Sequence, residues 1–357
     1  MTRPPAPKHS LRRKLCGCLF AIPESAPKLY SDKAYDFNDW EWHKNAAWRH
    51  RMEPWTFFLV ASGFVWQLAH VLIASIIVGL YHEMLVPLGA PHANSQLTNA
   101  MGMVTGCLSL LLVFRTNSSY SRWWEARILW GSVVNLSRNY ARQVMLWAPP
   151  ERTSVARLGA RWMAIAVHVM RAHLRQKHLG RVTQEASHLL TLDEFNWLAH
   201  WRSAPQGAAH VLAWSAANLG IDYQRERVLQ DLIVTFINNL GACERILRTP
   251  MPTAYTRHTS RFLLVYITLA PAMLWPTTGW ATPFCALLIG FLLLGTENIG
   301  VQIEEPFKVL PLDTICNTIE NSIRDMELRH YGACSMDKLV SEHAGNDTSS
   351  LYVEDNG

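Results

Sequence analysis

The fold is decided by a stretch that directly follows an apolar segment, Phe114-Arg115-Thr116-Asn117-Ser118-Ser119-Tyr120-Ser121-Arg122-Trp123-Trp124-Glu125-Ala126-Arg127. Two adjacent tryptophans stand here among three arginines and one glutamate. Tryptophan suits the boundary between lipid and water, where arginine can reach the aqueous side or pair with a carboxylate such as Glu125. The stretch therefore predicts the end of a membrane helix, followed by an ordered collar packed against protein.

The placement of basic residues predicts where the membrane lies. Residues 54–114 and 262–307 contain no lysine or arginine, and all 33 basic residues lie outside these two blocks. Turn-forming residues divide the first block between 81 and 99 and the second between 276 and 283. The sequence thus predicts an all-α integral membrane protein with four transmembrane helices, at about 55–80, 97–114, 255–275 and 282–301. A soluble helical protein with buried hairpins is the alternative.

The positive-inside rule puts the N-terminus, the middle of the chain and the C-terminus on one side of the membrane. Residues 115–250 and 302–332 are expected to form a helical cytosolic or stromal part, in which Asp222 caps a helix. An apolar stripe on that helix predicts packing between helices, and comprises Val228, Leu229, Leu232, Ile233, Phe236, Ile237 and Leu240. Residues 1–35 are expected to be a flexible basic tail or a transit-peptide remnant, and residues 333–357 a disordered tail.

Composition argues against several function classes. A net charge of +5, without interleaved basic and aromatic residues, does not favour nucleic-acid binding. The seven cysteines are scattered, and the 15 histidines form no recognisable metal-binding motif. Phosphate-binding loops and nucleophile motifs are absent from the sequence, so we expect neither an enzyme nor a cofactor or resident metal. An integral membrane enzyme with its active site in residues 115–250 is kept as an alternative.

The second predicted helix is the candidate pore lining. Gly106, Leu110 and Phe114 are four residues apart and share one helix face, a pattern that by itself is more typical of a packing or lipid-facing stripe. Arg115, with Arg122 and Arg127 further on, either attracts anions to a pore mouth or pairs with carboxylates and helix ends. Asn117 and its neighbouring hydroxyls are expected to bond backbone groups where the helix leaves the membrane.

Three stretches resemble the bestrophin family of anion channels. The first is Phe114-Arg115 through Asn117 to Arg122-Trp123-Trp124-Glu125-Ala126-Arg127, and the second is Pro252-Thr253-Ala254-Tyr255-Thr256-Arg257 continuing through Thr259-Ser260-Arg261-Phe262-Leu263. The third runs from Glu297 to Glu304-Glu305-Pro306-Phe307. The likeness covers residues 36 to about 326, and within the family it is closest to the voltage-dependent chloride channels of plant and algal thylakoids. It implies a channel domain over 36–332 that forms a homopentamer around a central pore.

The resemblance also implies roles for particular residues. Gly106, Leu110 and Phe114 correspond to the family's apolar neck, although Gly106 departs from the bulky residue usual there. Arg257 and Arg261 are expected to ring the inner aperture or to extend from the membrane interface. Glu297 is expected to belong to the structural signature of the family, or to pair with an arginine elsewhere in the fold. A calcium clasp of the animal type is not expected, because Asp313 stands without further carboxylates and Lys308 precedes it.

The expected function is passive, calcium-independent and voltage-dependent or otherwise gated conduction of chloride, with the lipid bilayer, small anions and further copies of the chain as partners. The chloroplast thylakoid is the expected membrane, and other cellular membranes stay open. A bicarbonate channel of an algal plastid and a non-conducting scaffold of the same fold are the alternatives.

Overall fold

The computed structural model describes residues 63–91, 95–175 and 186–332, with side chains from residue 102 onward in the second range. Within these ranges the chain forms α-helices and short 3₁₀ helices and no strand, which confirms the all-α prediction for this part of the chain. The predicted tails at 1–35 and 333–357, like positions 55–62 of the first membrane helix, lie outside the described residues.

The described chain divides into two compact units. Unit 1 contains residues 63–91, 95–121 and 251–304, and unit 2 contains residues 122–175, 186–250 and 305–332.

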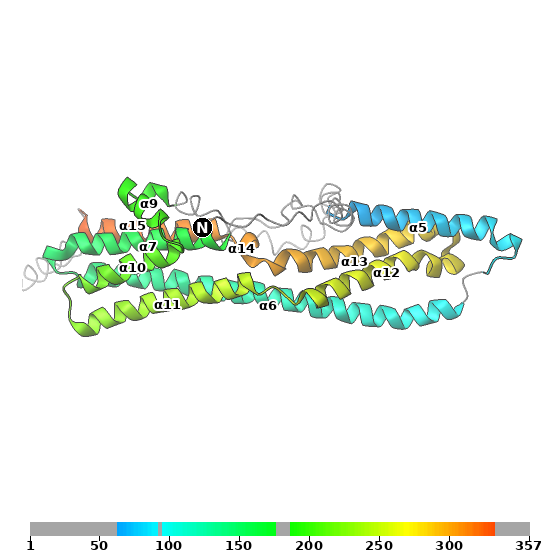
Figure 1. Cartoon of the computed structure of the whole chain (residues 1–357), viewed down its shortest axis with the longest axis horizontal. Helices are drawn as coiled ribbons and strands as arrows, with labels where there is room; N and C mark the ends of the chain where they lie inside the picture. Colours follow the sequence, from blue (N-terminus) through cyan, green and yellow to red (C-terminus); the bar gives the residue numbers. More distant parts are fainter. Residues whose placement is uncertain (1–62, 92–94, 176–185, 333–357) are drawn as a thin grey trace, which may run out of the picture. The chain divides into compact units, whose positions relative to one another are not determined.

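Unit 1 holds α5 (Val65–Met84), η1 (Val86–Leu88), the first part of α6 (Ser95–Trp147), α12 (Thr253–Thr278), η4 (Gly279–Ala281) and α13 (Thr282–Glu304). Helices α5, α12 and α13 pack against one another (Figure 1). Together with the first part of α6 they form an apolar core that includes Val71, Leu108, Leu263 and Ala286. Within the described residues, segments 65–88 and 253–304 are long and apolar enough to cross a membrane, the second containing both α12 and α13.

The predicted breaks in the apolar blocks lie close to the observed turns. Gly89 ends η1 with a φ of 95°, and Gly279 follows α12 with a φ of 50°. Both are left-handed values that a residue without a Cβ adopts readily. Pro271 and Pro276 lie inside α12, which continues to Thr278 rather than ending at 275 as predicted.

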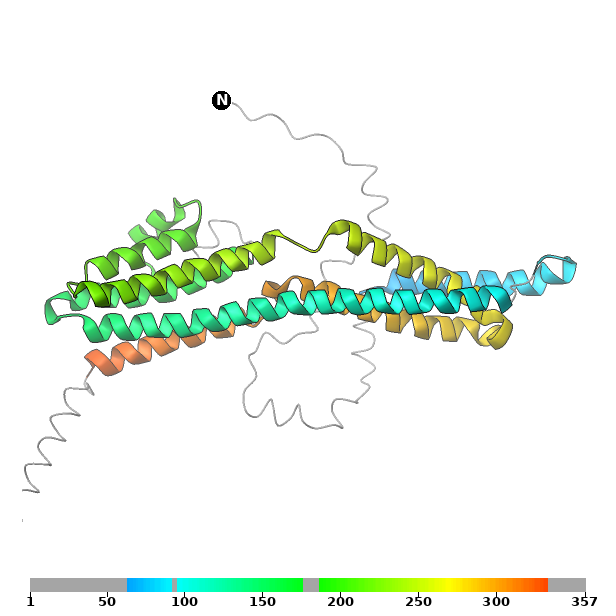
Figure 2. The ribbon, with the colours of Figure 1, turned by 90° about the horizontal axis from the view of Figure 1, so that it is seen from below.

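The prediction that the second membrane helix ends at 114 is wrong, because α6 is one continuous helix of 53 residues (cyan to green in Figure 2). Residues 107–130 contain no glycine or proline. The hydroxyls of Thr116, Ser118 and Ser121 donate to carbonyls one turn earlier, at 2.9 Å each. Because a helix pairs its own backbone N–H and C=O groups in lipid and in water alike, a change from apolar to polar side chains does not end it.

Unit 2 contains the remainder of α6, then η2 (Pro150–Arg152), α7 (Thr153–Leu174), η3 (Ser187–Leu189), α9 (Leu192–Ala199), α10 (Ala204–Ala217), α11 (Tyr223–Arg248), α14 (Pro306–Val309) and α15 (Leu312–Tyr331). Helix α7 lies at its centre, with every residue from 162 to 172 buried. A Cβ built on Gly159 would lie 2.8 Å from the Ser215 hydroxyl, which explains the glycine at this contact between α7 and α10.

The start of α11 confirms the prediction for Asp222, whose carboxylate accepts from the backbone N–H groups of Gln224 at 3.0 Å and Arg225 at 3.1 Å. The predicted apolar stripe is narrower than expected. Leu229, Ile233, Phe236 and Leu240 are buried, whereas Val228 and Ile237 are exposed. The buried positions follow a spacing of four, three and four residues, which places Val228 and Ile237 beside the contact rather than in it.

Candidate pore-lining site

The first part of α6 has two unlike faces. Gly106, Leu110 and Phe114 lie on its exposed face, and the side chains of Leu110 and Phe114 are each 55% exposed. Leu108 and Leu112 lie on the buried face and belong to the unit 1 core. A Cβ on Gly106 would meet nothing within 4 Å, so unit 1 itself leaves this face uncovered. The three predicted neck residues therefore share one uncovered strip of helix.

Arg115 does not share that face, which departs from its expected place at a pore mouth. Its guanidinium is buried and donates to the Glu297 carboxylate at 2.6 Å and to the Ser260 hydroxyl at 3.2 Å. Ser260 also donates to the same glutamate oxygen. The group joins α6, α12 and α13, as the alternative pairing hypothesis for Glu297 predicted. The buried ion pair of Arg115 with Glu297 links α6 to α13, and Ser260 adds α12. Arg115 and Glu297 are 182 residues apart in the sequence, so no local pattern indicates that they pair.

Arg257 and Arg261 have the opposite environment. Both are exposed on α12, one helical turn apart, and share their face with the exposed Val265 and Leu269. Neither arginine forms an ion pair with a described residue. Two adjacent guanidinium groups without a carboxylate make a local positive surface that favours anions.

In the predicted collar, residues 122–127, Arg122 and Glu125 are held by contacts within unit 2. Arg122 donates to the carbonyls of Ile246 at 2.6 Å and Thr249 at 2.7 Å, so it caps the C-terminal end of α11. Glu125 pairs with Arg245 at 2.7 Å rather than with its neighbours in sequence. The adjacent tryptophans differ: Trp123 packs against the unit 2 core, whereas Trp124 is 49% exposed. Asn117 in unit 1 and Arg127 in unit 2 are exposed on α6.

The second stretch of the family resemblance positions α12. Pro252 immediately precedes its first turn, and the Tyr255 hydroxyl donates to the Leu111 carbonyl of α6 at 3.2 Å. Glu304 at the end of α13 accepts from the Met251 N–H at 3.3 Å. These contacts hold α12 against α6 and α13 and so set the direction of Arg257 and Arg261.

The third stretch leads into a turn at α14. Glu305 pairs with Lys308 at 2.9 Å, Pro306 opens the helix, and Phe307 is fully buried. Asp313, the one carboxylate expected near a calcium clasp, pairs through one oxygen with Arg171 at 3.1 Å and through the other with Arg175 at 2.6 Å. Both oxygens therefore face positive groups.

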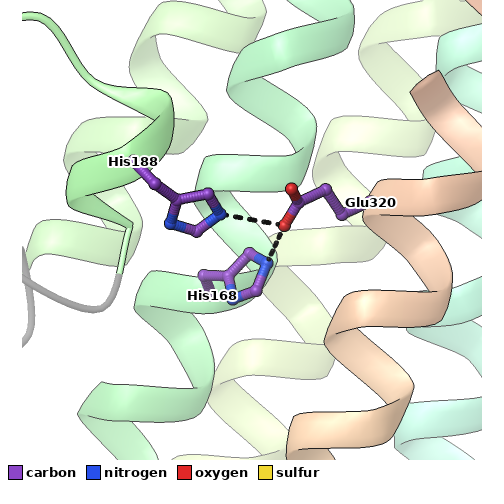
Figure 3. A group of neighbouring side chains, drawn as sticks. All are labelled: His168, His188 and Glu320. Atoms are coloured by element: carbon purple, nitrogen blue, oxygen red, sulfur yellow. Dashed lines mark hydrogen bonds and ion pairs between the residues drawn. The ribbon is translucent and has the colours of Figure 1, made fainter.

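Sequence analysis missed a group of titratable side chains in unit 2. Nε2 of His168 lies 2.8 Å, and Nε2 of His188 lies 3.1 Å, from the same carboxylate oxygen of Glu320 (Figure 3). Burial and the nearby Arg171 lower the pKa of His168, against the hydrogen bond to Glu320. Burial opposes ionisation of Glu320, but hydrogen bonds from His188 and His168 lower its pKa. His188 and Glu320 follow His168 by 20 and 152 residues in the sequence, a spacing that matches no sequence motif.

The comparisons with known proteins agree on one family. Residues 46–325 match the family described as "Bacterial/Fungal Bestrophin protein". A protein of Nostoc, named a voltage-dependent anion channel-forming protein, is 33% identical over 291 residues, which are 78% of this chain and 89% of the relative. A chloroplastic protein of Arabidopsis thaliana, named voltage-dependent chloride channel 1, is 28% identical over 61% of this chain and 53% of its own length.

Solved structures give the same result. A crystal structure of a bacterial bestrophin homologue from Klebsiella pneumoniae, determined for a variant with a point mutation, has 25% sequence identity and a TM-score of 0.66. The likeness covers 73% of this chain and 98% of that one. The fold and the match together define a helical membrane protein of the channel class, and not an enzyme. The chain belongs to the bestrophin family.

Proposed function

We propose that the chain forms a homopentameric channel that conducts small anions, chloride foremost, through a central pore lined by α6. The observation that carries the proposal is the uncovered face of α6, where Gly106, Leu110 and Phe114 lie opposite a buried face of the same helix. Copies arranged around an axis would turn this face inward. The names of the relatives, which refer to anion and chloride channels, support the choice of ion.

In this proposal Leu110 and Phe114 form the neck. A ring of apolar side chains holds water poorly when narrow and therefore acts as a gate without any charged group. The positive edges of Phe114 rings can face an anion when the neck is wet. Gly106, which offers no side chain, widens the ring at its own level.

Arg257 and Arg261 then supply charge selectivity. Their exposure on one face of α12, without a carboxylate partner among the described residues, suits a positive ring that attracts anions. Arg115 plays no such part, because Glu297 neutralises it.

We also propose that conduction needs no calcium and is gated by voltage. The calcium proposal rests on Asp313, since a carboxylate held between Arg171 and Arg175 is a poor ligand for a cation. The voltage proposal rests on the names of the relatives, and the thylakoid membrane is proposed on the chloroplastic ones.

Purified full-length protein in planar bilayers tests the function. Chloride and potassium gradients in calcium-free solution should give currents whose reversal potential follows chloride, and a bicarbonate gradient ranks the second ion. Currents that follow the cation, or that need added calcium, would reject the corresponding proposal. A silent bilayer with verified pentamers would favour a non-conducting scaffold.

The neck is tested by replacing Leu110 and Phe114 together with alanine. We expect a severalfold larger resting anion current, because the smaller ring stays wet. Phe284 and Leu288 provide a matched control: they are the same two residue types, four positions apart and exposed on α13. Their double alanine variant should leave the resting current unchanged. Equal currents from both variants in correctly assembled channels would remove α6 from the pore.

A further inference from the structure

The group of His168, His188 and Glu320 brings three potential metal ligands to one point. One ring nitrogen of each imidazole and a carboxylate oxygen of Glu320 all lie within 4.8 Å of one another. Figure 3 shows both rings directing Nε2 toward the same oxygen, from α7, η3 and α15. Two histidines and one carboxylate are a ligand set that zinc uses in proteins, with the fourth position left to water.

The distances fit an ion after a small movement. Zinc binds histidine nitrogen and carboxylate oxygen at about 2.0 to 2.2 Å, so tetrahedral ligand atoms stand about 3.3 Å apart. The two separations from Glu320 are 2.8 and 3.1 Å. An outward shift of a few tenths of an ångström would therefore bring the Glu320 oxygen to the tetrahedral distance from both imidazole nitrogens, which themselves lie within 4.8 Å of each other. His188 is 52% exposed and can supply much of that shift by rotating its side chain.

Charge distinguishes this carboxylate from its neighbours. Arg161 is paired with Glu194, Arg157 with Glu327, and Arg171 with Asp313. Glu320, by contrast, forms hydrogen bonds and ion pairs only with the two imidazoles among the described residues. Arg324, one turn further along α15, lines the same cavity but forms no ion pair with Glu320. A partly buried carboxylate between two imidazoles lacks a permanent counter-charge, and a divalent cation supplies one.

An access path is present within the same unit. His188 and Glu320 line an open cavity of about 730 Å³ between α7, η3 and α15. An ion can enter from this cavity, and its fourth position can face water there.

We propose that His168, His188 and Glu320 bind one Zn²⁺ ion per subunit, which ties η3 to α7 and α15. The bond is coordination alone: in each neutral imidazole the proton that Nε2 donates to Glu320 moves to Nδ1, and the Nε2 lone pair then binds the ion. The ion replaces the two hydrogen bonds to Glu320, and no oxidation or group transfer is involved.

The test measures zinc in the full-length protein, purified without a polyhistidine tag, stripped with a chelator and dialysed against micromolar zinc chloride. Elemental analysis should find about one zinc ion per subunit more in the natural chain than in His188→Ala or Glu320→Gln. Loss of a partner beyond the ligand shell already weakens zinc sites by about 10- to 100-fold, so loss of a ligand should weaken binding at least as much. Cobalt substitution should give the visible absorption of a tetrahedral site in the natural chain and not in His188→Ala or Glu320→Gln.

The matched control is His173, on the same helix, which pairs with Glu244 at 2.7 Å and is not part of the three-residue group. His173→Ala should keep the zinc content and the cobalt spectrum. Since His188 is exposed, its replacement is not expected to prevent folding, and gel filtration checks the assembly. Zinc content equal in the natural chain and in His188→Ala, or no bound zinc in either, would overturn the proposal and leave a hydrogen-bonded triad.

Discussion

The two units of the chain place their polar and apolar groups in opposite ways. In unit 1 large apolar side chains face outward, as with Ile77 at 60% and Phe284 at 74% exposure, and the ion pair of Arg115 with Glu297 lies inside. In unit 2 the buried side chains are large and apolar, with Trp130 and Phe236 at 0% exposure.

The difference is the one expected if a bilayer surrounds unit 1 and water surrounds unit 2. A bilayer core accepts exposed leucine and phenylalanine and penalises an exposed charge, which fits the enclosed pair of Arg115 with Glu297 in unit 1. Water reverses both preferences, and unit 2 accordingly carries several of its ion pairs on its surface, as with Glu125 and Arg245 at 47% and 64% exposure. An exposed apolar side chain or an exposed charge is therefore expected to affect stability differently in the two units.

The largest loss in free energy of unfolding is expected from breaking the buried ion pair of Arg115 with Glu297 in unit 1. Glu297→Gln removes the counter-charge of Arg115 and leaves a buried cation, which should cost about 3–5 kcal/mol. Thermal unfolding in detergent measures the loss. Glu305→Gln is the control, because its pair with Lys308 is exposed and should cost less than about 1 kcal/mol. Equal shifts for both variants would mean that burial of the Arg115 pair adds nothing to stability.

A smaller effect is expected from Glu194 in unit 2, which accepts from both terminal nitrogens of Arg161 at 2.6 and 2.8 Å. Glu194→Gln should lower the free energy of unfolding by about 1–3 kcal/mol near neutral pH, because hydrogen bonds to a charged group are lost. Asp193→Asn, exposed on the same turn of α9, should have little effect.

The stabilisation from Glu194 should also depend on pH. Burial opposes its ionisation, but hydrogen bonds from Arg161 and Thr191 lower its pKa from 4.5 to about 2. Because the folded-state pKa is the lower one, the contribution is complete above about pH 4.5 and is lost as the pH falls toward about 2. The difference in unfolding temperature between the natural chain and Glu194→Gln should therefore shrink below pH 4.5. A difference that stays constant down to about pH 3 would contradict the low pKa.

The smallest effect on stability is expected for Arg257 and Arg261, which have no ion pair to lose among the described residues. Replacing both with glutamine should change the free energy of unfolding by less than about 0.5 kcal/mol. The permeability ratio of chloride to potassium should nevertheless fall, since a positive surface is removed. Arg202→Gln with Arg227→Gln, two exposed arginines of unit 2, makes the same change in net charge and should leave that ratio unaltered.

The sequence was most informative where a local rule sufficed. Two blocks without lysine or arginine located the apolar helices, and Gly279 with its neighbouring prolines located the turn between α12 and α13. Asp222 was identified as a cap because a short carboxylate before a helix reaches the free N–H groups of its first turn.

Contacts between distant positions were beyond such rules. The end of the apolar run at Phe114 predicts the end of a helix, although nothing in the backbone requires the helix to stop there. Arg115 and Glu297, and likewise His168 and Glu320, meet only because helices far apart in sequence pack together. A single sequence records the residue types of such a pair but not their proximity.

The turn at Gly279 bears on how the protein is made. Three residues separate α12 from α13, and the hydroxyls of Thr278 and Thr282 lie 2.7 Å apart across it. Both helices therefore leave the ribosome in one segment of 52 residues that can enter the bilayer as a hairpin. Ser260 and Glu297 face each other within this hairpin, so one continuous segment of the chain supplies both groups that accept hydrogen bonds from Arg115.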